Sequence, residues 1–99
     1  MKCLGVESTA HTFSCAVLER KGKRGEILSD VRKIYGPPEG EGIHPREASR
    51  HHVENSTVAL VEALQKAKVS VTDLDIISYA AGPGLGPCLR VGAVVSRAL

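Results

Sequence analysis

The sequence is poor in aromatic side chains, and this limits what can fill its core. It has no tryptophan, one phenylalanine and two tyrosines. Hydrophobic residues still make up 42% of the chain, so a core is available, but aliphatic and alanine side chains must build it. At 99 residues, the chain supplies at most one small domain of this kind.

Paired cysteines and long apolar runs are also missing. The three cysteines, Cys3, Cys15 and Cys88, have no CxxC spacing and follow no secretory signal, which argues against a disulfide framework. No apolar stretch approaches the roughly 20 residues that cross a bilayer. We therefore expect a cytoplasmic protein with no membrane partner.

Neither sign of charge dominates. Thirteen basic and 11 acidic residues give a net charge of +2, too balanced to indicate nucleic-acid binding by charge alone. The basic residues Arg20, Lys21, Lys23 and Arg24 do gather in one segment. We interpret them as a solvated hairpin tip, and a binding patch is the alternative.

Three short β-strands are predicted at the start of the chain, over residues 3–6, 13–18 and 27–35. Polar residues 7–12 separate the first two strands, and the glycines of residues 22–25 turn the chain into the third. The order predicts an antiparallel meander.

A long helix is predicted after the glycine- and proline-rich loop at residues 36–42. Pro45 suits the first helical position, and the helix should end near Lys68. One stripe of residues at three- and four-residue spacing is expected to face the core: Val53, Thr57, Leu60, Val61, Leu64 and Ala67.

The last third of the chain predicts a fourth strand and a second helix. Residues 76–80 are continuously apolar, which is typical of a strand covered on both faces. A glycine-rich stretch, residues 82–92, follows, with the helix beginning near Leu89. A meander, a helix, a strand and a second helix resemble one half of the actin-like, ribonuclease-H-like fold, an α/β fold whose mixed sheet is covered by helices.

The turn after the first strand is the first candidate for chemistry. Hydroxyls and backbone N–H groups at Ser8, Thr9 and Thr12 suit phosphate oxygens, and the Glu7 carboxylate beside them suits a metal or its bound water. The alternative is a polar hairpin turn whose side chains cap their own backbone. The sequence leaves the two about equal.

The start of the long helix is the second candidate. Glu47 and His51 lie one helical turn apart, a spacing that allows a metal pair or a hydrogen-bonded acid/base pair. His51 and His52 are adjacent and diverge around the helix, so they cannot share a metal, and we assign no metal ligand in the chain. A plain charged helix start and a polar surface facing a ligand or a partner lobe are the other interpretations.

The glycines after the fourth strand are the third candidate. A strand that feeds a glycine-rich turn and then a helix brings backbone N–H groups up to an anion, and Gly82, Gly84 and Gly86 allow that close approach. The alternative is a tight connection between strand and helix.

Together, these segments resemble the N-terminal part of the tRNA threonylcarbamoyladenosine synthase family. The His-Pro-Arg-Glu-Ala form of the helix start resembles its archaeal and eukaryotic branch, the catalytic subunit of the KEOPS complex. The resemblance rests on residues 5–12, on residues 44–48 with His51 and His52, and on residues 81–86 with 89–92.

The resemblance implies an acyltransferase that moves a threonylcarbamoyl group from its adenylate to N6 of an adenosine in the tRNA anticodon loop. Residues 1–99 would form part of the N-terminal lobe of a two-lobed enzyme, inactive alone, with the second lobe outside this chain. The whole protein would bind an adenine nucleotide or threonylcarbamoyl-adenylate. It would also bind a divalent metal, iron or zinc, through a His-x-x-x-His pair and an aspartate further along. Its partners would be tRNA and KEOPS-type subunits.

Residue by residue, the resemblance makes Glu7, His51 and Glu47 the catalytic candidates, with Glu7 foremost as a carboxylate beside metal and phosphate. It places the following residues against the nucleotide and its phosphates: Ser8, Thr9, Thr12, Gly82, Gly84 and Gly86.

Two alternatives remain: an ATPase or small-molecule kinase lobe of the same fold, and a non-enzymatic scaffold that binds a partner. We also expect the 99-residue chain to self-associate, because apolar residues of the last helix need cover. These residues are Val91, Val94, Val95 and Leu99.

Overall fold

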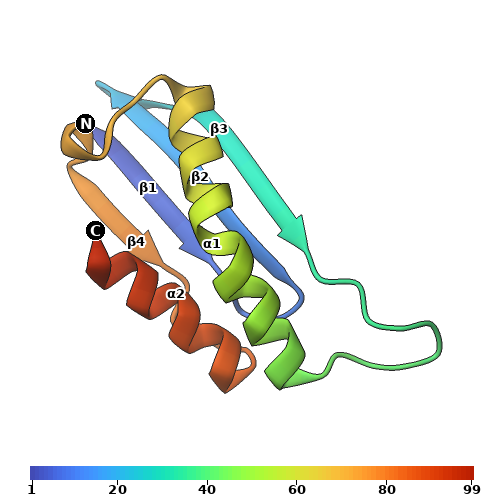
Figure 1. The fold of residues 1–99 in the computed structure, drawn as a ribbon. Helices are drawn as coiled ribbons and strands as arrows, with labels where there is room; N and C mark the ends of the chain where they lie inside the picture. The colour runs from blue at the N-terminus through green and yellow to red at the C-terminus, as the bar shows by residue number, and fades with distance from the viewer.

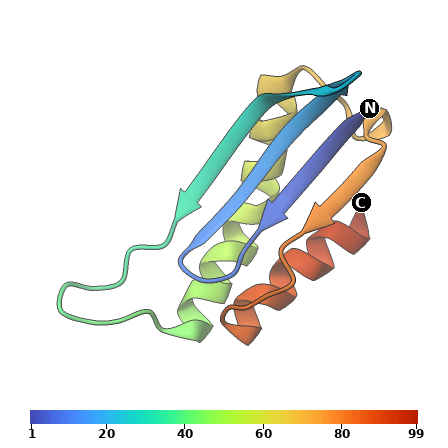
Figure 2. The same cartoon turned by 180° about the vertical axis from the view of Figure 1, so that it is seen from behind.

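The computed structural model describes all residues 1–99 as a four-stranded sheet with two helices against one face (Figures 1 and 2). The strand order is β3-β2-β1-β4. β1 (Lys2–Glu7), β2 (Thr12–Lys21) and β3 (Arg24–Ile34) form an antiparallel meander, and β4 (Ile76–Tyr79) pairs in parallel with β1. The predicted mixed sheet and its antiparallel meander are confirmed.

The core lies between the sheet and the helices and is built from alternate strand residues. Phe13, the only phenylalanine, is fully buried there. Aliphatic and small side chains supply the rest, as the composition predicts: Leu4, Val6, Cys15, Val17, Val31, Ala59, Ala63 and Val69. Burial raises the pKa of the Cys15 thiol to about 11, so this thiol stays protonated.

The first helix, α1 (Pro45–Ala67), begins at the predicted proline and ends at Lys68, which adopts the left-handed conformation (φ 57°). Its predicted core-facing stripe is only partly right: Leu60, Leu64 and Ala67 pack against the core, but the other members are exposed. Val53 is 61% exposed and Val61 45% exposed. The buried residues lie on a neighbouring face and are Ala48, His52, Ser56, Ala59 and Ala63.

Small side chains on this face let α1 lie close to the sheet. The Ser29 hydroxyl of β3 donates a hydrogen bond of 2.7 Å to the backbone carbonyl of Ala63. A larger residue at Ala59 or Ala63 would hold the two layers apart. The buried face is therefore chosen by closeness of packing rather than by the largest apolar side chains.

The prediction that β4 is covered on both faces is also wrong. Ile76 is 44% exposed and Tyr79 38% exposed. β4 lies at the edge of the sheet, and α2 (Gly86–Ala98) lies on the same face as α1, so the other face is bare (Figure 2). The start of β4 is aligned by Lys2 and Asp75. The N–H of Lys2 donates to the Asp75 carboxylate at 2.8 Å, and the N–H of Asp75 donates to the Lys2 carbonyl at 2.8 Å.

The helices are short or polar by membrane standards. Neither α1 nor α2 combines the length and the apolarity that crossing a bilayer requires.

Candidate functional site

The three segments singled out from the sequence meet at one end of the molecule. Figure 1 shows β1 and β4 ending where α1 and α2 begin, and we call this the strand-exit end. Unpaired N–H groups and partial positive charge gather at helix starts, which suits an anion. This end also carries the turn between β1 and β2 and the loop of residues 80–85.

The Glu7 carboxylate is only half used by its own turn. Its Oε1 atom accepts the backbone N–H of Thr9 at 2.7 Å and also the Thr9 hydroxyl. Self-capping therefore accounts for Oε1, whereas no group of the chain hydrogen-bonds Oε2. Glu7 therefore keeps one oxygen without a partner in the chain.

That carboxylate borders a depression of about 530 Å³ on the helix-free face of the sheet. Thr12, a predicted phosphate ligand, borders the same depression, and its hydroxyl lies 2.7 Å from Nδ1 of His11. His11 was given no role from the sequence, although it lies in the same polar turn. The lining residues are Glu7, His11, Thr12, Ser14, Ala16, Asp30, Arg32 and Ile34.

Ser8 is buried and fully bonded, unlike its neighbours. Its hydroxyl donates to the Cys88 carbonyl at 2.7 Å and accepts the N–H of Gly92 at 3.0 Å. A Cβ atom at Gly92 would lie 2.6 Å from this hydroxyl. Ser8 therefore fastens the turn to α2 and has no free position for a phosphate oxygen.

Gly84 serves a close contact between loops. A Cβ atom there would lie 2.4 Å from the carbonyl oxygen of Thr9, and the N–H of Leu85 donates to that oxygen at 2.7 Å. Only glycine allows this approach. Gly84 and Thr9 are thus brought together, and the loop is fixed against the β1–β2 turn.

The helix α2 begins earlier than predicted, at Gly86 rather than near Leu89. Its first helical hydrogen bond runs from the N–H of Leu89 to the carbonyl of Leu85 at 2.9 Å. Pro87 has no N–H, so Gly86 and Cys88 supply the free donors of the first turn. Gly82 lies in the preceding loop. Burial raises the pKa of the Cys88 thiol, so it remains protonated and is no nucleophile.

His52 lies fully buried in the face of α1 that meets the sheet. Its Nε2 atom donates to the carbonyl of Ala10 at 2.6 Å, and its ring lies 6.0 Å from that of Phe13 between centroids. Burial lowers the pKa of His52, outweighing the Ala10 hydrogen bond and the nearby Glu7 charge. The sequence analysis assigned no role to His52. Its four-residue spacing from Ala48 and Ser56, which share the buried face of α1, was the pattern that could have indicated its burial.

His51 pairs with His52 and not with Glu47. The two Nδ1 atoms of the histidines lie 3.1 Å apart. No hydrogen bond joins His51 to Glu47, so the acid/base pair that their spacing allows does not form. Glu47 is exposed. Burial, with the charges of Glu47 and Glu41, raises the pKa of Tyr35, whose ring lies 5.8 Å from that of His51.

The residues present do not fit a metal centre. No three histidine, cysteine, aspartate or glutamate side chains come together in a way that could hold an ion.

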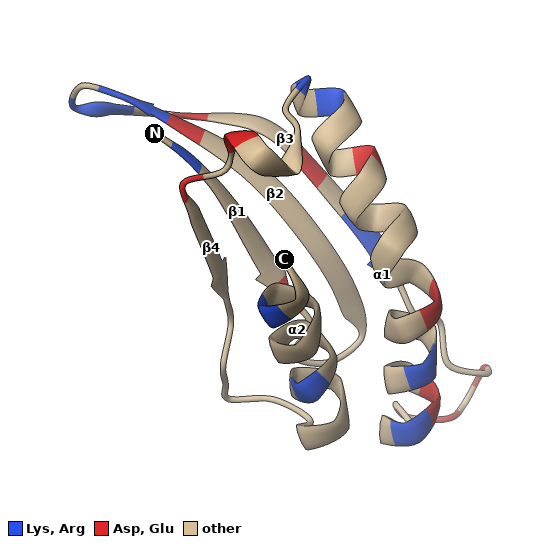
Figure 3. Ribbon diagram, turned by 60° about the vertical axis from the view of Figure 1, so that its left-hand side comes forward, with Lys and Arg blue, Asp and Glu red and all other residues tan.

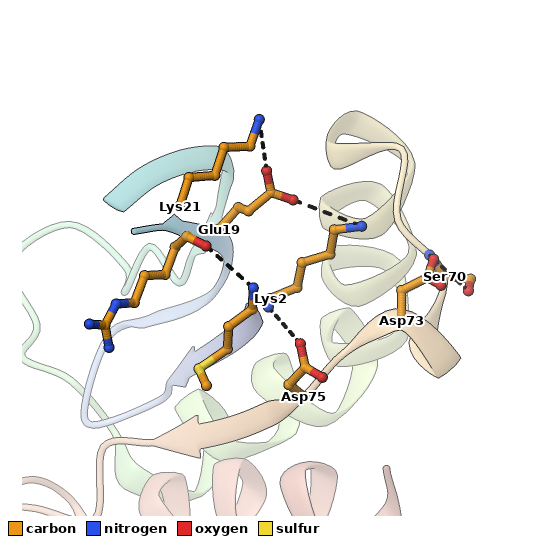
Figure 4. Close-up of polar contacts among 8 residues, drawn as sticks. Lys2, Glu19, Lys21, Ser70, Asp73 and Asp75 are labelled. Atoms are coloured by element: carbon orange, nitrogen blue, oxygen red, sulfur yellow. Dashed lines mark hydrogen bonds and ion pairs between the residues drawn. The ribbon is translucent and has the colours of Figure 1, made fainter. Parts of the chain in front are cut away.

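The basic segment lies at the opposite end of the molecule (Figure 3). Figure 4 shows Glu19 between Lys21 and Lys2, with nitrogen–oxygen distances of 3.2 and 3.9 Å. Arg20 donates to the Gly22 carbonyl within the two-residue turn, and the surrounding side chains are exposed. These contacts suit the solvated hairpin tip, remote from the strand-exit end.

Comparison with known proteins places the chain in a family. Residues 26–99 match the family model described as tRNA N6-adenosine threonylcarbamoyltransferase. The chain belongs to this family. It is 52% identical over 99 residues to the tRNA N6-adenosine threonylcarbamoyltransferase of Pyrobaculum islandicum and 50% identical over 99 residues to that of Ignicoccus hospitalis.

The match covers all of this chain but only part of each relative. The chain spans 28% of the Pyrobaculum islandicum protein and 29% of the Ignicoccus hospitalis protein. Among solved structures, YeaZ from Pseudomonas aeruginosa has a TM-score of 0.71 at 18% identity, covering 98% of this chain and 37% of YeaZ. This likeness confirms the actin-like α/β fold.

Proposed function

We propose that this chain is part of an enzyme that transfers a threonylcarbamoyl group to N6 of an adenosine in tRNA. The observation that carries the proposal is the family match over residues 26–99, joined to 52% identity along the whole chain. Activity, substrate and partners are inferred from the relatives' names, because the chain spans 28% of their length.

The strand-exit end suits the acyl donor in this reaction. The adenylate carries a phosphate, and the free N–H groups of Gly86 and Cys88 at the start of α2 supply donors for an anion. The Thr12 hydroxyl and the unbonded oxygen of Glu7 lie at the β1–β2 turn and border the depression on the helix-free face of the sheet. We propose these groups as the ones that bind and orient the donor.

The transfer itself is an attack of the adenosine amine on the donor's carbonyl carbon. A C–N bond forms, the bond from carbon to the phosphate oxygen breaks, AMP leaves, and the amine gives up a proton. The exocyclic amine is a poor nucleophile, so holding the two reactants in line contributes much of the rate. Loops fixed by Ser8 and Gly84 supply the rigid frame this needs.

The remaining inferences from the resemblance are part of the same proposal. We place the iron or zinc ion in residues outside this chain, the nucleotide or adenylate at the strand-exit end, and KEOPS-type subunits among the partners. We also propose that the protein acts in the cytoplasm.

The test is product analysis with the full-length protein that carries this chain. We would incubate it with threonylcarbamoyl-adenylate and a tRNA, then digest the tRNA and analyse its nucleosides by mass spectrometry. A modified adenosine is expected, and it should disappear when guanosine replaces the anticodon-loop adenosine. Phosphorylation of a small molecule or ATP hydrolysis without tRNA modification would support the kinase alternative and contradict the proposal.

A further inference from the structure

The hydrogen bonds around His52 fix where its ring carries a proton. The Ala10 carbonyl can only accept, so the Nε2 atom 2.6 Å away must be the donor. His52 is fully buried, among Phe13, Ala10 and His51, and no carboxylate pairs with it directly. A neutral ring follows from this environment, which leaves Nδ1 of His52 with an unshared electron pair.

The contact with His51 then fixes the second ring. Two Nδ1 atoms 3.1 Å apart repel each other if both are bare or both are protonated. Since Nδ1 of His52 is bare, Nδ1 of His51 must carry the proton and donate it. In a neutral His51 ring, the Nε2 atom is therefore the one with the unshared pair.

That Nε2 atom is free to meet a ligand. The only side-chain hydrogen bond of His51 is the one to His52, and the residue is half-buried rather than enclosed. The nearby Tyr35 hydroxyl makes no hydrogen bond to it or to any other group. His51 lies in the second turn of α1, near the strand-exit end.

We propose that His52 is a positioning residue that holds His51 as the Nδ1–H tautomer, so that His51 Nε2 accepts a hydrogen bond from an N–H or O–H group of the substrate. The chain of bonds runs from the Ala10 carbonyl through both rings. One part rests on the function proposed above: in that reaction, the group that donates this hydrogen bond is the adenosine amino group that receives the acyl group.

The direct measurement is the tautomer of each ring in the full-length protein. Nitrogen-15 NMR of histidine-labelled protein distinguishes a protonated from a bare ring nitrogen, and single His→Gln variants assign the signals. The expected result is a neutral His52 protonated at Nε2 and a neutral His51 protonated at Nδ1. His51 protonated at Nε2, or a charged His52, would overturn the proposal.

Two variants separate positioning from simple structural support. His52→Asn places an amide oxygen near the Nδ1 position and keeps the acceptor for His51. His52→Gln places an amide N–H near the Nε2 position and keeps the bond to Ala10. We expect the Asn variant to retain the His51 tautomer and the Gln variant to lose it, although Gln preserves the tie between α1 and the turn.

The same pair tests the use of the acceptor in transfer. The Gln variant should slow the transfer rate about 100-fold, the low end of general-base effects, and the Asn variant only a few-fold. Equal rates in the two variants would overturn the role in transfer. Absence of transfer in the wild type would refute the proposed function, while the NMR result still decides the tautomer.

Discussion

At the strand-exit end, whether a position must be glycine depends on what a Cβ atom would contact there. At Gly84 it would lie 2.4 Å from the Thr9 carbonyl oxygen, a backbone atom that cannot swing aside. At Gly86, two residues on, nothing lies within 4 Å. The two positions look alike in the sequence and differ only in the folded chain.

Gly84→Ala should therefore destabilise the protein by about 1–3 kcal/mol, the usual cost of forcing extra atoms into a packed contact. Gly86→Ala is the matched control and should stay within about 0.5 kcal/mol of the parent. Urea denaturation of both variants measures the difference in the free energy of unfolding. Equal stabilities would show that Gly84 is not needed for the contact with Thr9.

Ser8 and Gly92 are a second pair of residues whose identities depend on a close contact between them. Ser8→Ala removes the two buried hydrogen bonds that the Ser8 hydroxyl makes with the Cys88 carbonyl and the Gly92 N–H, which should cost about 1–3 kcal/mol. Gly92→Ala drives a Cβ atom to within 2.6 Å of the Ser8 oxygen. Because removing that oxygen relieves the clash, the double variant should lose less stability than the two single losses added together. Strict additivity in a double-mutant cycle would contradict the contact.

At the scale of elements, the strands and the ends of α1 were predictable, whereas the start of α2 and the buried faces were not. Turn residues and Pro45 mark ends locally, so the meander and the bounds of α1 follow from the sequence. Which face of α1 is buried depends on how closely the helix approaches the sheet. The small residues Ala59 and Ala63 are buried, whereas Val53 and Val61 are exposed. Similarly, the apolar run of β4 carries no information on which elements cover it.

The docking of α1 on the β1–β2 turn should depend on pH through His52. Its folded pKa lies below the usual 6.5, so below pH 6.5 the unfolded chain binds a proton that the folded chain refuses. The stability is full above that value and is lost as the pH falls through the folded pKa. Glu62 and Asp73 have pKa values lowered from 4.5 and 3.8, so they act only in more acid solution.

We therefore expect the free energy of unfolding to fall between about pH 7 and about pH 5.5, the range in which histidine titrates. His52→Asn should flatten this slope. An unchanged slope in His52→Asn would show that another group controls acid stability.

For the whole molecule, long-range contacts decided what the sequence left open at the site. Residues 7–12 and 82–86 were predictable as turns with hydroxyls and glycines, and the structure brings both to one end. The partners of Ser8 lie 80 and 84 residues away, so its role in fastening α2 could not be deduced from local pattern. Whether His51 pairs with His52 depends on how closely α1 packs against the sheet, which the local sequence does not show.

The exposed apolar face of the helices bears on how the 99-residue chain behaves alone. A groove of about 340 Å³ between α1 and α2 is lined by Val53, Ser56, Arg90, Val91, Val94 and Val95. Val94 is 66% exposed. Apolar surface of this kind favours association.

Sedimentation of the 99-residue chain should accordingly show self-association that Val94→Asp weakens. Ile27→Asp is the control, because Ile27 is also 66% exposed but lies on β3, outside the groove. A stable monomer at high concentration, or an equal effect of both substitutions, would contradict association through the groove.

The most direct test of the proposed site is the transfer rate of Glu7→Gln in the full-length protein. Glutamine keeps one oxygen to accept the Thr9 N–H, but it replaces the other, unbonded oxygen with an NH2 group and removes the charge. If the carboxylate acts on the reacting groups, the rate should fall about 10²–10³-fold, as for other preorganised electrostatic groups, with the melting temperature unchanged. Wild-type turnover in Glu7→Gln, with activity and stability lost together in Glu7→Ala, would show that Glu7 only caps its turn.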